Sequence, residues 1–161
     1  CNLDVLVSCK ACTDGGLYLE NQGDGTFLDR SGLLPGEGNN YQLAPMDLDG
    51  DGDLDLVTIN DGGAGLTERI LKNDLNGETG TFVDATDELW PEDAQLEGSD
   101  DNVALLLDID SDGDPDLIVG SLSSEDRVLE NDGSGKLSLL GPAVDGAATS
   151  GTLGMEVADL D

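Results

Sequence analysis

The sequence has no histidine, only six lysine or arginine residues, and few aromatic side chains: two phenylalanines, two tyrosines and one tryptophan among 161 residues. The scarcity of basic residues argues against a nucleic-acid ligand, which is bound through clusters of lysine and arginine, and against an anionic membrane surface. No stretch approaches the roughly 18 apolar residues of a membrane-spanning helix, so we expect no membrane insertion. Without histidine or a G-x-S-x-G motif, the sequence also lacks the groups of a serine hydrolase.

The 36 acidic residues give the chain a formal charge of -30 at pH 7. High charge combined with few aromatic residues is a composition found in disordered chains. Here, however, the apolar residues fall into short, repeated, β-branched runs, which are typical of strands in a folded domain. We therefore attribute the acidic excess to ion-binding loops and to a solvated acidic surface.

Two nine-residue segments, 47–55 and 108–116, share the pattern D-x-D-x-D-G-x-x-D. Each places five carboxylates at alternate positions, where the charges repel one another unless a cation lies among them. Hard oxygen ligands in this number suit calcium, which takes about six to eight oxygens, and the glycine at the sixth position permits the sharp turn. The sequence therefore predicts two calcium loops with these candidate ligands: Asp47, Asp49, Asp51, Asp53 and Asp55 in the first, and Asp108, Asp110, Asp112, Asp114 and Asp116 in the second.

The pattern is compatible with two other kinds of loop. The first is a solvated Asp/Gly-rich turn without a metal, which the presence of two aligned copies disfavours. The second is an EF-hand, which requires a glutamate at position 12 and a helix on each side. Thr58 and Val119 stand at position 12 inside predicted strands, so the EF-hand is excluded. Incomplete copies of the loop provide weaker candidates at Asp4, Asp159 and Asp161.

The loops belong to a longer repeat. Asp108 and Asp159 are 51 residues apart, as are Asp4 and Asp55. Each repeat holds four short runs of strand length, and a period of about 50–60 residues with four strands is typical of propeller blades. We therefore predict an all-β fold made of four-stranded antiparallel blades, with strands at 3–8, 17–20, 26–28, 41–46, 55–59, 69–72, 81–83, 103–107, 117–119, 128–130 and 137–139.

This periodicity divides the chain into parts of a β-propeller. We expect a partial blade at 1–40, full blades at 41–102 and 103–152, and the start of another at 153–161. Two full blades and parts of two neighbours cannot close a ring, because complete propellers have about 4–8 blades. We therefore expect the chain to be part of a larger propeller, with closure by several copies as an alternative.

The three cysteines, Cys1, Cys9 and Cys12, lie close together at the start of the chain. Cys9 and Cys12 form a C-x-x-C motif, but no second pair or histidine completes a zinc site. A local loop disulfide is the favoured interpretation. Two free thiols and a catalytic redox pair remain as alternatives.

Several segments of the chain resemble the FG-GAP/VCBS repeat family, which forms the blades of integrin α-subunit propellers and occurs in many secreted bacterial proteins. They are MDLDGDGDLDLV from Met46, LDIDSDGDPDLIV from Leu107, LYLENQGDGTF from Leu17 and ILKNDLNGETGTF from Ile70. The last two are especially similar to the cartilage-acidic-protein branch. The sequence departs from the family pattern in lacking an intact Phe-Gly or Gly-Ala-Pro token.

The resemblance implies a seven-bladed parent and an extracellular location, secreted or at the cell surface. It also assigns the side-chain ligands to positions 1, 3, 5 and 9 of each loop, and implies that Asp53 and Asp114 contribute their backbone carbonyls at position 7. Because each loop joins two strands of one blade, we expect calcium to have a structural role.

We expect a calcium-stabilised interaction or adhesion module, not an enzyme. A protein or glycan partner would contact the loops opposite the calcium turns, at 30–40, 60–68, 84–102 and 121–126. Trp90, in the longest of these loops, is the strongest candidate for an aromatic surface site. The alternative is an accessory or catalytic propeller of a secreted carbohydrate-active enzyme, such as a polysaccharide lyase.

Overall fold

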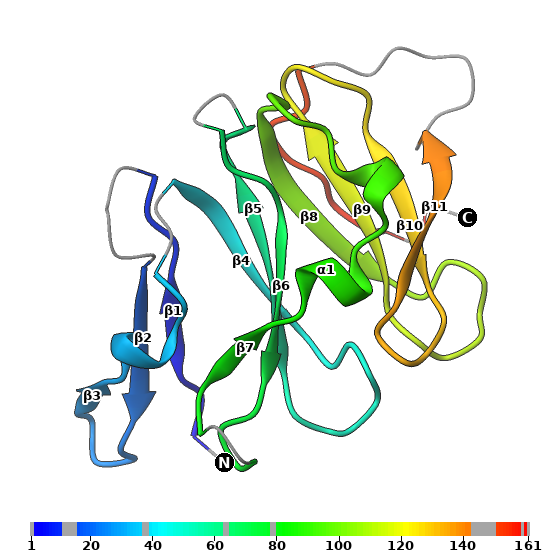
Figure 1. Ribbon diagram of the computed structural model, residues 1–161. Helices are drawn as coiled ribbons and strands as arrows, with labels where there is room; N and C mark the ends of the chain where they lie inside the picture. The colour runs from blue at the N-terminus through cyan, green and yellow to red at the C-terminus, as the bar shows by residue number, and fades with distance from the viewer. Residues whose placement is uncertain are drawn as a thin grey trace.

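The computed structural model describes residues 2–10, 16–36, 39–62, 65–77, 80–142, 151–158 and 160. Three antiparallel sheets lie side by side, and the colour in Figure 1 runs through them in chain order. The first has three strands, β1 (Val5–Val7), β2 (Leu17–Asn21) and β3 (Phe27–Asp29). The second has four, β4 (Asn40–Met46), β5 (Asp55–Asn60), β6 (Arg69–Asn73) and β7 (Phe82–Asp84). The third has β8 (Asp101–Leu107), β9 (Asp116–Ser121), β10 (Arg127–Asn131) and β11 (Leu137–Pro142).

Within each sheet the strands follow one another in chain order, and every neighbouring pair is antiparallel. Such meanders, connected by short turns and repeated side by side, are the blades of a propeller. The prediction of an all-β fold, a propeller fragment built of antiparallel blades, is therefore confirmed.

Strand β5 shows how the sheets are held together. All six of its residues are buried, because the second sheet lies between the other two. Its side chains alternate between faces, as in any strand. Leu56 packs into the cluster shared with the first sheet, and Val57 and Ile59 pack into the larger cluster shared with the third. The apolar run that identified this strand therefore contributes to two cores at once.

The connections between sheets contain short helices that the sequence analysis treated as loops. They are η1 (Ser31–Leu33), α1 (Thr86–Leu89) and η3 (Glu92–Ala94). The carboxylate of Asp29 accepts hydrogen bonds from the amide and hydroxyl of Ser31, and Asp84 does the same for Thr86. These local contacts turn the chain after the last strand of a blade, which is why a helical turn follows.

Trp90 was predicted as a surface site, and the structure corrects this. Its side chain is only 5% exposed and belongs to the larger core cluster. Trp90 directly follows the short helix α1, and its indole packs with residues of the second and third sheets instead of forming a platform for a ligand.

Cys9 is disulfide-bonded, which excludes a free thiol at that position. Cys1 and Cys12 lie outside the described residues, so the pairing within the C-x-x-C motif stays a prediction. Among the described residues, no helix has the length and apolar character needed to cross a membrane.

Candidate metal centres

The two predicted calcium loops occupy equivalent places, one between β4 and β5 and the other between β8 and β9. Both are closed by the same internal hydrogen bonds. The amide of Gly52 donates to Asp47 at 3.1 Å, and that of Gly113 donates to Asp108 at 3.2 Å. The glycines have φ values of 91° and 102°, a region that residues with a side chain rarely adopt. The repeated pattern of the sequence thus produces the same turn twice.

A second pair of contacts involves position 5 of each loop. The amides of Asp53 and Asp114, at position 7, donate to the carboxylates of Asp51 and Asp112, at 2.9 and 3.0 Å. These contacts hold the backbone in place at position 7 of each loop. The resemblance implies that the backbone carbonyls of Asp53 and Asp114 bind the ion, and this stays a prediction.

The aspartate at position 9 is the buried anchor of each loop. Asp55 and Asp116 are each 1% exposed. One carboxylate oxygen of Asp55 accepts from the amide of Leu48 within the loop, and the other accepts from the amide of Asn73 at the end of β6. Burial raises the pKa of Asp55, and the two amides oppose this by stabilising the charged form. The anchor therefore connects the loop to the third strand of its own sheet.

Asn73 and its counterpart Asn131 support the loops, but the predicted strands end one residue before them, at 72 and 130, and the sequence analysis gave them no role. The amide of Asn131 donates to Asp116 at 2.8 Å, matching the Asn73–Asp55 contact. Its side chain also donates to the backbone carbonyl of Leu48, in the metal loop of the neighbouring sheet, at 2.8 Å. A signal was present in the sequence as a Leu-x-Asn token, which ends β2, β6 and β10 at Asn21, Asn73 and Asn131.

Some of the predicted ligands converge on a common point. Carboxylate oxygens of Asp47, Asp49 and Asp51 lie within 4.8 Å of one another, and so do those of Asp108, Asp110 and Asp116. Two oxygens on opposite sides of one calcium ion are separated by about 4.6–5.2 Å, twice the usual bond length. Both groups therefore match the span of a single calcium ion. The remaining predicted ligands, Asp53, Asp55, Asp112 and Asp114, lie in the loops but outside these groups.

The first loop offers a further test of fit. One oxygen of Asp47 and one of Asp49 are buried and have no hydrogen-bond partner in the protein. A buried carboxylate oxygen without a partner is costly, and a bound cation would satisfy both. The donor set, made of carboxylate oxygens only, suits a hard cation such as calcium.

Of the incomplete copies of the loop, only the one at Asp4 lies among the described residues. Asp4 is exposed but makes the same contact as the anchor, since its carboxylate accepts from the amide of Asn21 at 2.8 Å, as Asp55 does from Asn73. Asp159 and Asp161 lie outside the described residues.

The two loops differ in backbone strain at position 4. Gly50 has φ of 72° in the first loop, whereas Ser111 has φ of 67° in the second. A non-glycine residue in this left-handed region costs about 1–2 kcal/mol, partly offset by the lower unfolded-state entropy of serine. Ser111→Gly should therefore raise the free energy of unfolding by about 0.5–1 kcal/mol, measured by urea denaturation. The reverse change, Gly50→Ser, should lower it, and a loss of stability in Ser111→Gly would contradict this account.

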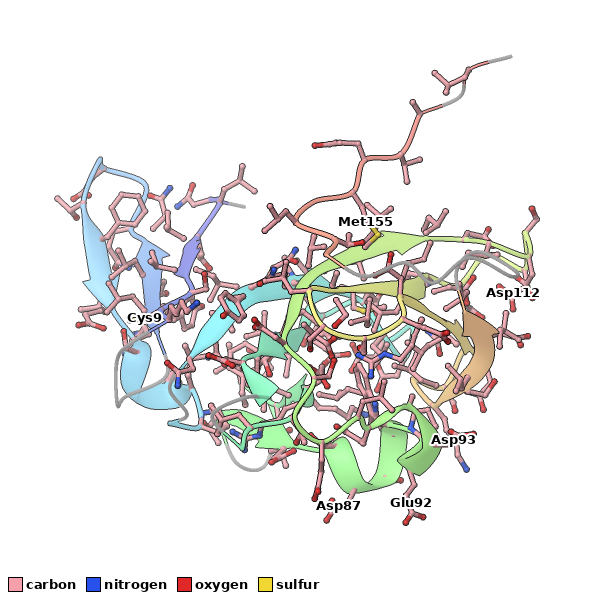
Figure 2. The ribbon with its side chains drawn as sticks, turned by 90° about the horizontal axis from the view of Figure 1, so that it is seen from above. Cys9, Asp87, Glu92, Asp93, Asp112 and Met155 are labelled. Carbon is pink, nitrogen blue, oxygen red and sulfur yellow. The ribbon has the colours of Figure 1, made fainter. Side chains whose placement is uncertain are left out.

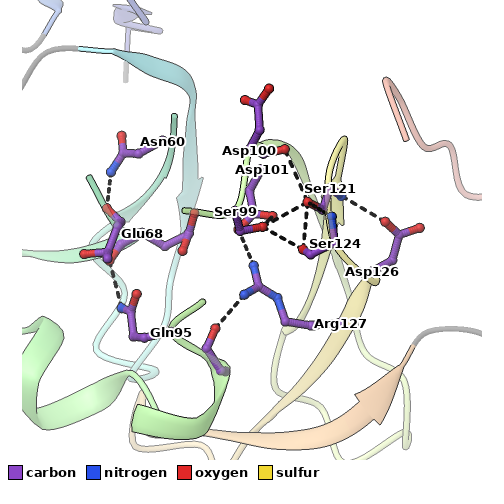
Figure 3. A network of polar contacts seen from close by, with 12 residues as sticks. Asn60, Glu68, Gln95, Ser99, Asp100, Asp101, Ser121, Ser124, Asp126 and Arg127 are labelled. Atoms are coloured by element: carbon purple, nitrogen blue, oxygen red, sulfur yellow. Dashed lines mark hydrogen bonds and ion pairs between the residues drawn. The ribbon is translucent and has the colours of Figure 1, made fainter. Parts of the chain in front are cut away.

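At the opposite end of the sheets, the loops contain a buried polar network (Figure 3). Arg127 forms an ion pair with Asp101 and donates to the backbone carbonyl of Ala94 at 2.6 Å. Glu68 lies close enough to Asp101 for the two carboxyl groups to interact, and both residues are almost fully buried. Ser99 donates to Asp101 at 2.7 Å. Its hydroxyl also contacts those of Ser121 and Ser124, at 3.0 and 2.6 Å. Three of the four loops predicted to meet a ligand, 60–68, 84–102 and 121–126, are therefore joined beneath their surface.

Burial, followed by the charge of Asp101, raises the pKa of Glu68 to about 8. The folded protein thus holds this proton more tightly than the unfolded chain, in which the pKa is near the ordinary value of 4.5. The contribution of Glu68 to the free energy of unfolding is fully present below pH 4.5, where the group is protonated in both states. As the pH rises from 4.5 to about 8, this contribution falls by at most about 1.4 kcal/mol per pH unit. Glu68→Gln keeps a neutral hydrogen-bonding side chain and should remove this loss.

The measurement is the free energy of urea unfolding at several pH values between 5 and 8, for both proteins in EDTA. We expect the difference between Glu68→Gln and the original protein to grow in favour of the variant as the pH rises. A constant difference across this range would show that Glu68 is not protonated in the folded state.

Comparison with family models identifies the repeat. The model described as FG-GAP-like repeat matches residues 1–58 and 108–161, more than half of the chain, and includes both metal loops. A comparison with curated proteins found no significant match. Together with the three antiparallel sheets, this match shows that the chain belongs to the FG-GAP-like repeat family.

Proposed function

We propose that this protein is a calcium-stabilised extracellular interaction module, which binds a protein or glycan partner through the face opposite its metal loops. FG-GAP-like repeats form propeller modules, and the two groups of carboxylates support calcium as the bound ion. Because the metal loops are closed and anchored to neighbouring strands, they support a structural role for the ion. Partner binding is then left to the other face.

The observation that carries this proposal is a surface depression of about 600 Å³ between segments 60–68 and 84–102. These are two of the loops expected from the sequence to meet a ligand. Figure 2 shows Asp87, Glu92 and Asp93 projecting outward from this region. The depression is lined by polar and acidic residues together with one edge of the buried tryptophan: Thr67, Thr86, Asp87, Trp90, Glu92, Gln95 and Glu97.

The composition of the depression favours binding over catalysis. A polysaccharide lyase requires a base positioned to remove a proton, and no lysine, arginine or tyrosine lines the depression. Three carboxylates and two hydroxyls can instead accept and donate hydrogen bonds to hydroxyl or amino groups of a partner. We therefore propose that the module is not an enzyme.

A further partner is the remainder of the propeller. Leu48, at position 2 of the first loop, is 1% exposed because the hairpin after β10 covers it. Ile109 stands at the same position of the second loop and is 38% exposed. This difference supports a further blade that packs against the third sheet.

The experiment is a glycan array and a polysaccharide panel, probed with the chain in millimolar calcium, with turnover followed by product analysis. We expect binding without cleavage, and a loss of binding in Glu97→Gln. The matched control is Asp24→Asn, which removes one exposed charge from a hairpin at the metal end and keeps its carbonyl acceptor. Cleavage products would favour the enzymatic alternative instead.

A further inference from the structure

Lys72 makes a contact that only one of the two metal loops has. It lies on β6, and its ammonium group pairs with one carboxylate oxygen of Asp49, the residue at position 3 of the first loop. The other oxygen of Asp49 is buried and has no partner in the protein. Lys72 therefore neutralises part of the loop's charge and leaves one oxygen of Asp49 without a protein partner.

The second loop has the opposite charge at the equivalent position. Leu71 pairs with Leu56 in the second sheet, and Leu129 pairs with Leu117 in the third. The next residue along each strand is Lys72 in the second sheet and Glu130 in the third. The two loops share the same turn and the same anchor, but one neighbouring strand supplies a cation and the other a carboxylate.

Two effects of Lys72 on a bound cation oppose each other. By pairing with Asp49, it holds that side chain in place, which reduces the ordering needed on binding. Its positive charge also repels a divalent cation held by the same carboxylate, and this repulsion acts at a few ångströms between groups partly removed from water. We expect the repulsion to outweigh the gain from ordering. Only the short side chain of Asp49 is ordered by the pairing, and this side chain is just 14% exposed.

We propose that Lys72 is a built-in counter-ion of the first loop, which keeps this loop folded without calcium and makes it the weaker of the two calcium sites. The inference rests on the proposed binding of calcium. The second loop, with Glu130 beside it, is then the site that fills first as the calcium concentration rises.

The test uses variants in which one loop is disabled. Asp110→Ala removes a ligand of the second loop, so calorimetric titration with calcium then reports on the first. In this background, Lys72→Met should tighten calcium binding about tenfold, and Lys72→Glu should tighten it further. The matched control is Lys136→Met, an exposed lysine outside both loops. In the Asp51→Ala background, which reports on the second loop, Glu130→Lys should weaken binding by a similar factor.

Thermal unfolding in EDTA provides a second readout. Without calcium, Lys72→Met should lower the melting temperature relative to Lys136→Met, because the carboxylates lose their internal cation. With saturating calcium, the order should reverse. If calcium binds but Lys72→Met changes the affinity less than twofold, the role of Lys72 is overturned while calcium binding stands. If neither single-loop background binds calcium, the proposed function itself fails.

Discussion

Replacing Arg127 with methionine should lower the free energy of unfolding by about 3–5 kcal/mol, because the change leaves the carboxylate of Asp101 buried without its cation. Arg127 and Asp101 have side chains that are 5% and 0% exposed, so water cannot take over the lost contact. Glu68, which interacts with Asp101, adds a second carboxyl group to the same site. The loss is measured by urea denaturation at pH 7.

A matched control exists within the chain. Arg30 pairs with Glu20 at 2.8 Å, but these side chains are 47% and 38% exposed. Exposed pairs contribute about 0–1 kcal/mol, so Arg30→Met should have little effect. The double variant Arg127→Met with Asp101→Asn should recover part of the loss, since the unpaired charge is removed. Equal effects of Arg127→Met and Arg30→Met would contradict a stabilising role for the buried network.

The network also couples stability to the face proposed for partner binding. Arg127 donates to the carbonyl of Ala94, which belongs to η3 in the connection between the second and third sheets. Gln95, which lines the depression, donates to the carbonyl of Glu68 at 3.0 Å. Loss of Arg127 should therefore loosen the depression as well as the core. We expect hydrogen exchange to increase in segment 92–98 of the variant before global unfolding.

The fold could be predicted because its signals are local and repeated. Runs such as Asp55–Asn60 combine β-branched residues with complete burial, and the repeat of the Asp/Gly loop fixes where each blade begins. Strand ends shifted by one to three residues, in several cases because flanking asparagine and aspartate residues continue the pairing, as Asn73 does opposite Phe82. Propensity alone assigns such polar residues to turns.

Features formed by residues far apart in the chain could not be predicted in this way. Glu68 precedes β6 in the second sheet, whereas Asp101 and Arg127 begin β8 and β10 in the third, and the packing of the two sheets brings Glu68 to the other two. The burial of Trp90 likewise depends on the short helix before it, which has only four residues and leaves no periodic pattern. Asn131 reaches Leu48 across 83 positions of sequence. In each case the contact is set by the packing of blades, which a local pattern does not encode.

Calcium should raise the free energy of unfolding by about 2.7 kcal/mol for each loop when its concentration is 100 times the dissociation constant, and by about 5 kcal/mol if both loops bind. The reason is the cost of closely spaced carboxylates in the folded protein without a cation. In the first loop, this cost includes two buried oxygens of Asp47 and Asp49 that no protein group satisfies. Calorimetry in EDTA and in millimolar calcium measures the difference, with magnesium as a control for ionic strength.

Single-loop variants distinguish a specific site from general screening of the charge of -30. Asp110→Ala should remove the stabilisation that comes from the second loop and leave that of the first. Asp24→Asn, outside both loops, should leave both unchanged. If calcium stabilised all three proteins equally, the effect would be screening of the surface; if it stabilised none, neither loop would be a calcium site.

The first loop should show the wider effect of calcium, because it is joined to two sheets. Asp55 ties it to β6 in its own sheet, and the carbonyl of Leu48 accepts from Asn131 in the next. An ion that fixes this loop therefore stabilises the contact between blades as well as the turn itself. We expect calcium to slow hydrogen exchange at the end of β10 together with segment 47–55, and Asn131→Ala to separate the two responses. Exchange that slowed only within the loop would show that the ion acts on the turn alone.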